Sequence, residues 1–226
     1  MATTTSAPRP TPRPRADALR NRERIVVAAR EMFVEDGPQV RIDEIARRAG
    51  VGNATVYRHF PDRRALVHGV VCHVFQNISQ LAEAALADER DPFAALCTFV
   101  HESVDVRTSA LCPMLADDFD VDHPTLVETR NRIEKLVGAL LERAKESGQL
   151  RPDIAVTDLL LAVGQLTRPL PGRDAASSRS FAQRQLQVFL DGLMAPARSE
   201  LPGTPITLEE LRTQPCTVST TRSTER

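Results

Sequence analysis

The sequence predicts an all-α fold with two parts, an N-terminal three-helix domain containing a helix-turn-helix and a larger helical C-terminal domain. Three observations support this. Apolar residues recur at helical spacing, alternating strand patterns closed by hairpin turns are absent, and glycine, proline and capping residues divide the chain at helical lengths. We expect residues 1–15 to form a disordered basic arm, 16–66 the helix-turn-helix domain, 67–195 the second domain and 196–226 a disordered tail.

Local signals mark the expected helix ends in chain order. Gly37-Pro38 ends the first helix, and Gly148 ends a long helix in the second domain. Asp91-Pro92 places a capping residue before a proline at the first helical position, and His123-Pro124 opens a further helix. The expected helices are Asp17–Asp36, Ile42–Ala49, Asn53–His59, Asp62–Ala87, one from Pro92, Ser109–Ala116, one from Pro124 to Gly148, Ile154–Thr167 and Ser177–Met194.

Charge is distributed unevenly, although the net charge is only -1. Residues 1–70 contain 13 Arg and 8 Asp or Glu, whereas the rest of the chain contains 16 basic and 22 acidic residues. A basic N-terminal part suits phosphate contact, with a solvated charged face as the alternative. The four cysteines form no C-x-x-C pair, so we expect free thiols. No apolar run approaches the ~20 residues of a membrane span, and a signal peptide is not evident. We therefore expect a soluble cytoplasmic protein.

Residues Ile42–Phe60 have the spacing of a DNA-binding helix-turn-helix. Gly50 stands where the chain must turn sharply, because only glycine adopts a left-handed conformation without steric cost. Ala46 is small where the two helices cross, and the residues that can close the core between them are Ile45, Ala49, Val51 and Val56. The residues left facing outward, with groups suited to base edges or phosphates, are Gly52, Asn53, Thr55, Tyr57 and Arg58. Two ordinary core helices joined by a glycine turn are the alternative.

Basic residues flank this motif on both sides. Arg63 and Arg64 open the next helix, where a helix N-terminus and an arginine together favour phosphate. An arginine-rich segment before and within the first helix suits contact with the DNA backbone or minor groove. Its members are Arg9, Arg13, Arg15, Arg20, Arg22 and Arg24.

The segment Arg24–Val70, above all the stretch from Gly50 to Arg63, resembles the N-terminal domain of the TetR family of transcriptional regulators. The helix-turn-helix, the Tyr-x-His-Phe end of its second helix and the basic start of the next helix occur together and in order. Gly148–Asp153 is also similar to a segment of that family. The resemblance implies a repressor, not an enzyme, that binds a palindromic operator in double-stranded DNA as a homodimer. It also implies a small-molecule effector in a C-terminal ligand-binding and dimerisation domain.

The resemblance also implies individual DNA contacts. Thr55 and Tyr57 correspond to major-groove contacts, and Tyr57, His59 and Arg63 correspond to phosphate contacts. Arg41 stands where the family often has a Thr or Ser cap, so that cap is either lost or provided by Asp43. Asn53 replaces a basic or small residue of many members, so operator preference does not carry over. The complete set of candidate DNA-contacting residues is Arg41, Gly52, Asn53, Thr55, Tyr57, Arg58, His59 and Arg63.

The C-terminal domain suggests a dimer and a pocket. The helix at Ile154–Thr167 is apolar on all sides over Leu159–Val163 and therefore needs cover on two sides. The helix at Ser177–Met194 has an apolar stripe beside it, which predicts a four-helix homodimer interface formed by both helices. The candidate pocket residues, which ordinary core packing explains equally well, are Phe93, Cys97, His101, Phe119 and Leu160.

Other residues are compatible with metal binding or catalysis. The acidic run Asp117–His123 matches only the first half of a calcium loop, because Thr129 stands where the bidentate glutamate belongs, and no metal or cofactor is predicted. A helical enzyme is an alternative in which His101 would take part, but no Ser or Cys lies at a spacing that makes a nucleophile–base pair evident. A DNA-binding regulator whose C-terminal domain only dimerises is the other alternative.

Overall fold

The computed structural model describes residues 14–37, 39–106, 120, 122–168, 170, 172, 175–207 and 209–210. These residues form an all-α fold without strands, in agreement with the sequence prediction. The helices are α1 (Pro14–Glu35), α2 (Ile42–Ala49), α3 (Asn53–His59), α4 (Arg63–Ala87), α5 (Pro92–Val106), α6 (Pro124–Glu146), α7 (Val156–Leu166) and α8 (Ala175–Leu193). The expected bounds of α2 and α3 are reproduced, and the other described helices begin and end within three residues of their expected bounds. The short helix expected at Ser109–Ala116 lies outside the described residues.

Capping side chains stand at the starts of α4, α5 and α6, and the one at Asp91 was expected from the sequence. The Asp62 carboxylate accepts a hydrogen bond from the backbone N–H of Ala65 at 2.7 Å at the start of α4. The Asp91 carboxylate accepts from the N–H of Phe93 at 3.0 Å before α5, and Nδ1 of His123 accepts from an N–H in the first turn of α6 at 3.3 Å. These bonds satisfy backbone donors that have no partner within the helix.

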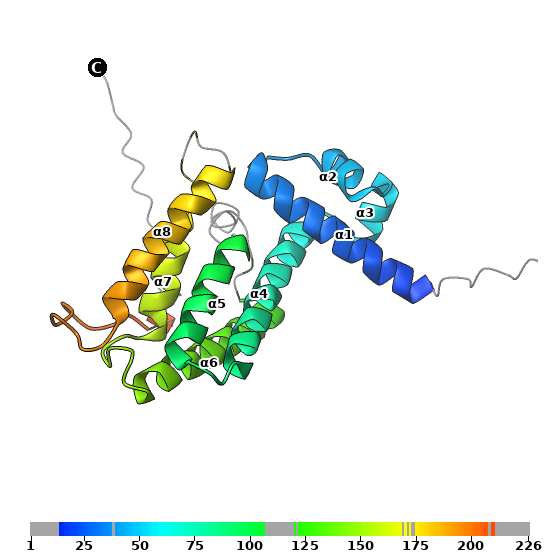
Figure 1. Ribbon diagram of the computed structural model, residues 1–226. Coiled ribbons are helices and arrows are strands. Elements are labelled where there is room, and N and C mark those ends of the chain that lie inside the picture. The colour runs from blue at the N-terminus through cyan, green and yellow to red at the C-terminus, as the bar shows by residue number, and fades with distance from the viewer. Residues whose placement is uncertain are drawn as a thin grey trace, which may run out of the picture.

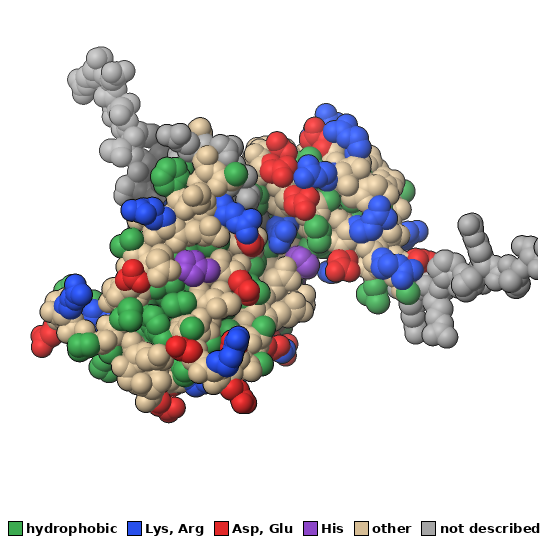
Figure 2. All heavy atoms as spheres, viewed as in Figure 1, with side chains coloured by type: hydrophobic (Ala, Val, Ile, Leu, Met, Phe, Trp, Pro, Cys, Tyr) green, Lys and Arg blue, Asp and Glu red, His purple; other side chains and the backbone are tan. Residues whose placement is uncertain are grey.

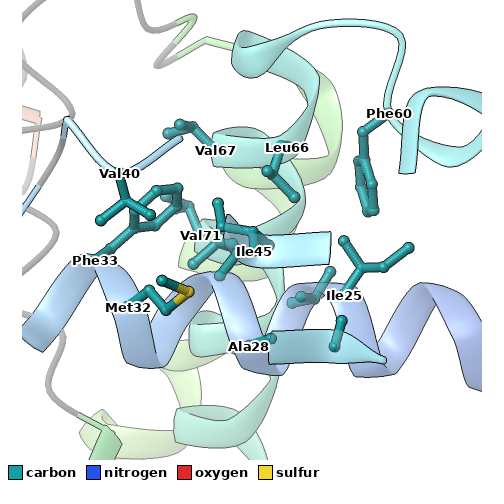
Figure 3. Packing of buried hydrophobic residues seen from close by; sticks show 14 of the residues in the cluster. Ile25, Ala28, Met32, Phe33, Val40, Ile45, Phe60, Leu66, Val67 and Val71 are labelled. Atoms are coloured by element: carbon teal, nitrogen blue, oxygen red, sulfur yellow. The ribbon is translucent and has the colours of Figure 1, made fainter. Parts of the chain in front are cut away.

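A first hydrophobic core holds α1, α2, α3 and the N-terminal half of α4 together (Figure 3). Figure 3 shows α1 side chains such as Ile25 and Phe33 pointing toward Ile45 of α2 and Leu66 of α4, with Phe60 at one side. Ile25, Ile45 and Leu66 are completely buried, and Phe60 is only 2% exposed. This core therefore fixes the helix-turn-helix on α1 and α4.

A second core lies between the C-terminal half of α4 and helices α5 to α8. Figure 1 shows α4 running from the α1–α3 end of the molecule into this larger bundle. The first core also includes Val106 at the end of α5 and Leu126 at the start of α6. Beside them, the rings of His68 in α4 and His123 before α6 lie 4.1 Å apart, centroid to centroid. The two parts of the protein thus meet through α4 and through the ends of α5 and α6.

Two arginine side chains hydrogen-bond to backbone carbonyl oxygens at the end of the bundle far from α3. Arg143 of α6 donates to the carbonyl oxygens of Leu86 and Asp88 at 2.6 and 2.9 Å, which ties down the end of α4. Arg151, in the loop between α6 and α7, donates to the carbonyl oxygen of Ser199 at 2.7 Å. The chain after α8, which we expected to lack structure from residue 196, is therefore anchored in its first residues because a buried arginine needs an acceptor.

Among the described residues, no helix combines the length and apolar character needed to cross a membrane.

Candidate DNA-binding interface

The turn between α2 and α3 has the geometry that the sequence motif requires. Gly50 ends α2 in the left-handed region, with φ 63° and ψ 39°. Its N–H donates to the carbonyl oxygen of Arg47 at 3.1 Å, and the N–H of Val51 donates to the carbonyl oxygen of Ala46 at 3.0 Å. These bonds close the helix end and redirect the chain into α3 within three residues.

Helices α2 and α3 meet through the small apolar residues that the sequence singled out. Ile45 and Val56 are completely buried, and Ala46 is 1% exposed where the helices pack. Ala49 is buried and Val51 is partly buried against the same core. The inner faces of both helices are therefore used for packing, which leaves the opposite face of α3 for a partner.

At the start of α2 the side-chain cap is lost, which was one of the two expectations. Arg41 precedes the helix, and its backbone N–H donates to the Glu44 carboxylate at 3.1 Å. Asp43 does not cap the helix, because its carboxylate instead accepts from Nε of Arg41 at 3.1 Å. Glu44 at the third helical position thus forms the half of a capping box that accepts the Arg41 N–H, while the Arg41 side chain stays exposed.

The outer face of α3 presents short polar side chains and one aromatic ring. Asn53 and Arg58 are exposed, Tyr57 is 51% exposed, and Thr55 is half-buried. Gly52, which precedes the helix, is exposed as well. Figure 2 shows Lys and Arg side chains over the part formed by α1, α2 and α3, with Asp and Glu side chains between them.

Two candidate contacts lie further inside than expected. His59 is half-buried, and its Nε2 atom is covered and has no hydrogen-bond partner among the described residues. Burial lowers the pKa of His59, and the nearby charges of Arg58 and Arg22 lower it further. Arg63 donates to the carbonyl oxygen of Val40 at 2.6 Å and is also half-buried. An internal position for Arg63 was not predicted, since Val40 is 23 residues away in the sequence.

Arginines of α1, which the sequence suggested for contact with DNA, have intramolecular partners in the structure. Arg24 donates to the carbonyl oxygen of Gly50 at 3.2 Å, and the Arg22 guanidinium lies 5.0 Å from the ring centroid of Phe60. Arg20 pairs with Asp17 on α1 itself. The members of the arm at Arg9 and Arg13 lie outside the described residues.

Phe60 and Gly69 form a close contact that the sequence analysis missed. A Cβ atom built on Gly69 in α4 lies 2.7 Å from Cε1 of Phe60, a distance that real Cβ atoms do not show. The ring of Phe60, at the end of α3, thus lies directly on the α4 backbone. A glycine within an expected helix often marks such close packing, so Gly69 was the available signal.

The candidate pocket residues occupy the bundle. Phe93, Cys97 and His101 follow one another at four-residue spacing on α5, and each is half-buried. His101 and Gln187 of α8 are hydrogen-bonded, with Nε2 and Oε1 3.0 Å apart. Leu160 of α7 is half-buried against the second core, and Phe119 lies outside the described residues. Burial raises the pKa of the Cys97 thiol to about 11, so this thiol stays protonated at neutral pH.

The acidic run and the cysteines are the remaining sequence features with groups that could bind a metal or react. No group of three or more His, Cys, Asp or Glu side chains is placed there to hold a metal ion. Of the acidic run Asp117–His123, the structure describes only residues 120, 122 and 123. Cys72 and Cys97 are free thiols, and Cys112 and Cys216 lie outside the described residues.

Two family models match most of this fold. Residues 25–70 match the model described as bacterial regulatory proteins, tetR family. Residues 91–195 match the model described as transcriptional regulator SbtR-like, C-terminal domain. The first match contains α2, α3 and the start of α4, and the second runs from α5 to the end of α8.

Known proteins are similar to this chain in sequence and in structure. The transcriptional regulator NfxB of Pseudomonas aeruginosa is 29% identical over 181 residues, which cover 77% of this chain and 95% of NfxB. The crystal structure of the TetR regulator SCO0520 from Streptomyces coelicolor has a TM-score of 0.60 and 30% identity, covering 78% of this chain and 99% of that one. The repressor LfrR of Mycolicibacterium smegmatis is 29% identical over 48% of this chain and 63% of its own length. These relatives are regulators and not enzymes, which contradicts the enzyme alternative.

Proposed function

The chain belongs to the TetR family of bacterial transcriptional regulators, and we propose that it is a cytoplasmic repressor that binds a palindromic operator as a homodimer and leaves it when a small molecule binds. The observation that carries this proposal is the exposed outer face of α3, a helix whose inner face is buried. A helix presented in this way suits insertion into the major groove. The proposed division at residue 66 leaves α1–α3 for DNA and residues 67–195 for the ligand and the second subunit.

The proposed base contacts lie in the first part of α3. Gly52, Asn53 and Thr55 bring the backbone and two short hydrogen-bonding side chains to the helix start, and Tyr57 and Arg58 follow on the outer face. Small polar groups at this end approach base edges closely, while the longer side chains reach phosphate or base.

Three flanking residues complete the proposed contact set. Arg41, exposed at the start of α2, extends the basic surface toward phosphate. His59 and Arg63 remain proposed phosphate contacts, and each would have to keep or exchange its internal position when DNA binds. For Arg63 the guanidinium has five N–H donors, so a phosphate and the Val40 carbonyl can be bound together.

Binding of α3 to DNA is tested with Tyr57→Ala and Thr55→Ala. The probe is a duplex selected by the wild-type protein from a random-sequence pool, and the dissociation constant is measured by fluorescence anisotropy. Loss of a good base contact is worth about 1–3 kcal/mol, so each variant should bind at least about tenfold more weakly. Lys135→Ala, an exposed change on α6, is the control and should bind like wild type. Unchanged affinity in both α3 variants would refute the role of this helix.

The proposed dimer uses α7 and α8. Phe181 and Val188 of α8 are 47% and 61% exposed and lie seven residues, or two helical turns, apart on one face. Leu161 of α7 is also exposed at 39%. Figure 2 shows hydrophobic side chains gathered over the side formed by α5, α7 and α8. Two copies joined through this apolar face would form a four-helix interface and present two copies of α3.

Sedimentation velocity tests the dimer. Phe181→Glu and Val188→Glu place a charge in the proposed interface and should give monomers, because an unpaired charge is costly to bury. Leu201→Glu is the matched control, since Leu201 is 41% exposed but lies beyond α8. Monomeric Leu201→Glu protein, or dimeric variants at both α8 positions, would contradict this interface.

Ligand control is the second part of the proposal. LfrR has been crystallised in complex with proflavine, and that structure has a TM-score of 0.59 to this chain with 22% identity. We infer that residues of the bundle, with Phe93, Cys97, His101, Phe119 and Leu160 as candidates, form the effector pocket. A library of planar cationic and neutral compounds, with proflavine as the first probe, should contain compounds that raise the melting temperature and release DNA. If compounds stabilise the protein without releasing DNA, control of DNA binding by ligand is refuted.

A further inference from the structure

Helix α3 is too short to hold its own position. It has only seven residues, and Gly52 before it offers no capping side chain. Isolated helices of this length do not form in water, so the direction of α3 depends on what holds its two ends. The buried Val56 holds only the middle of its inner face.

Arg24 of α1 holds the chain just before α3. Its guanidinium donates to the carbonyl oxygen of Gly50 at 3.2 Å, and one guanidinium nitrogen lies 2.6 Å from where a Cβ atom of residue 50 would stand. The arginine therefore occupies the space that a side chain would take in the turn. Gly50 is required there both for its positive φ and for this approach.

Arg22 of α1 holds the chain just after α3. Its guanidinium carbon lies 5.0 Å from the ring centroid of Phe60, within the range of a cation–π contact. The same ring lies against Gly69 of α4 and is 2% exposed. Phe60 closes α3, with its N–H donating to the carbonyl oxygen of Val56 at 2.8 Å, so its ring position sets where the helix ends.

We propose that Arg22 and Arg24 are positioning residues that fix the two ends of α3 on α1. This inference rests on the proposed function, in which α3 binds DNA. Each guanidinium is directed to an acceptor within the protein, the Phe60 ring or the Gly50 carbonyl. They contribute to DNA binding by orienting α3. Orientation affects the affinity for a specific sequence and leaves the number of phosphate contacts unchanged.

Salt dependence separates these two roles. Removing a phosphate contact lowers the slope of log K against log salt by about 0.9 per contact, or about twice that in a dimer, and weakens binding to every sequence alike. Removing a positioning residue weakens binding to the selected duplex. It changes neither the affinity for a shuffled duplex of equal composition nor the slope of log K against log salt. The variants are Arg22→Met and Arg24→Met, which keep a long apolar stem. Arg132→Met is the control, because Arg132 is an exposed arginine of α6 that pairs with Glu83 of α4 and touches neither end of α3.

We expect both variants to bind the selected duplex about tenfold more weakly, with the wild-type salt slope and the wild-type affinity for the shuffled duplex. A lower slope with equal loss on both duplexes would overturn the proposal, as would wild-type affinity in both variants while Tyr57→Ala loses binding. If Tyr57→Ala also binds normally, the failure lies in the proposed function itself.

Hydrogen–deuterium exchange of the free protein gives a second readout that needs no DNA. Backbone amides of residues 50–60 should exchange faster in Arg22→Met and Arg24→Met, while amides of α6 exchange as in wild type. Unchanged exchange across residues 50–60 in both variants would also overturn the proposal.

Discussion

Replacing Gly69 with alanine tests how closely the end of α3 packs on α4. A Cβ atom at position 69 lies 2.7 Å from Cε1 and 3.3 Å from Cζ of Phe60. Gly138 in α6 is the matched control, because a Cβ atom there meets only Cγ2 of Val156 at 3.7 Å, an ordinary van der Waals distance. Both glycines lie inside long helices, so the two substitutions differ mainly in this contact.

The magnitudes follow from helix propensity and packing. Alanine is favoured over glycine inside a helix by about 1 kcal/mol, which benefits both variants. At position 69 the new methyl group overlaps a buried ring, and overpacking of a filled core costs about 1–3 kcal/mol. We therefore expect Gly138→Ala to raise the free energy of unfolding by about 1 kcal/mol, and Gly69→Ala to leave it unchanged or lower it by up to about 2 kcal/mol.

Urea unfolding followed by circular dichroism, at one protein concentration, measures both values. Thermal melts should agree, since about 1 kcal/mol corresponds to about 2–4 °C for a chain of this size. Phe60→Leu should be less destabilising in the Gly69→Ala background than in wild type, because the smaller side chain relieves the overlap. Equal stabilisation by Gly69→Ala and Gly138→Ala would show that the ring moves without cost and would refute the reasoning.

Two further predictions concern pH and backbone conformation. Burial lowers the pKa of His59, His68 and His73, so their stabilising effect is complete above the ordinary pKa of 6.5 and is lost as the pH falls below it. The melting temperature should fall as the pH drops below 6.5, and it should fall less steeply in His73→Gln. An identical dependence of melting temperature on pH in His73→Gln would contradict the role of this histidine. Gly50→Ala and Gly148→Ala should each cost about 1–2 kcal/mol, because φ is 63° and 72° there. Only Gly50→Ala should weaken DNA binding, and equal affinities in anisotropy measurements would argue against the role of that turn.

Local signals were sufficient for the helix-turn-helix. The bounds of α2 and α3 depend on Gly50, on the proline after Phe60 and on apolar spacing within a few residues, all of which can be read along the chain. The same holds for the cap at Asp91, which precedes Pro92. At the start of α2 the sequence left open whether the cap is lost or provided by Asp43, and only the structure decided that it is lost and that Glu44 accepts the Arg41 N–H.

Contacts between distant residues were beyond the sequence. From sequence alone, an arginine in a basic segment is predicted to contact phosphate, whether or not its guanidinium has an acceptor within the protein. Arg24 reaches Gly50 across 26 residues and Arg63 reaches Val40 across 23, and neither pairing follows from spacing.

The amino-acid sequence by itself determined that the chain is helical, where it turns, and which face of α3 is polar, because these depend on residues within one or two turns of each other. Tertiary structure alone decided how α3 is held. The positions of the Arg22 and Arg24 guanidinium groups and of the Phe60 ring depend on how α1 and α4 cross α3, and that crossing is set by the shared core.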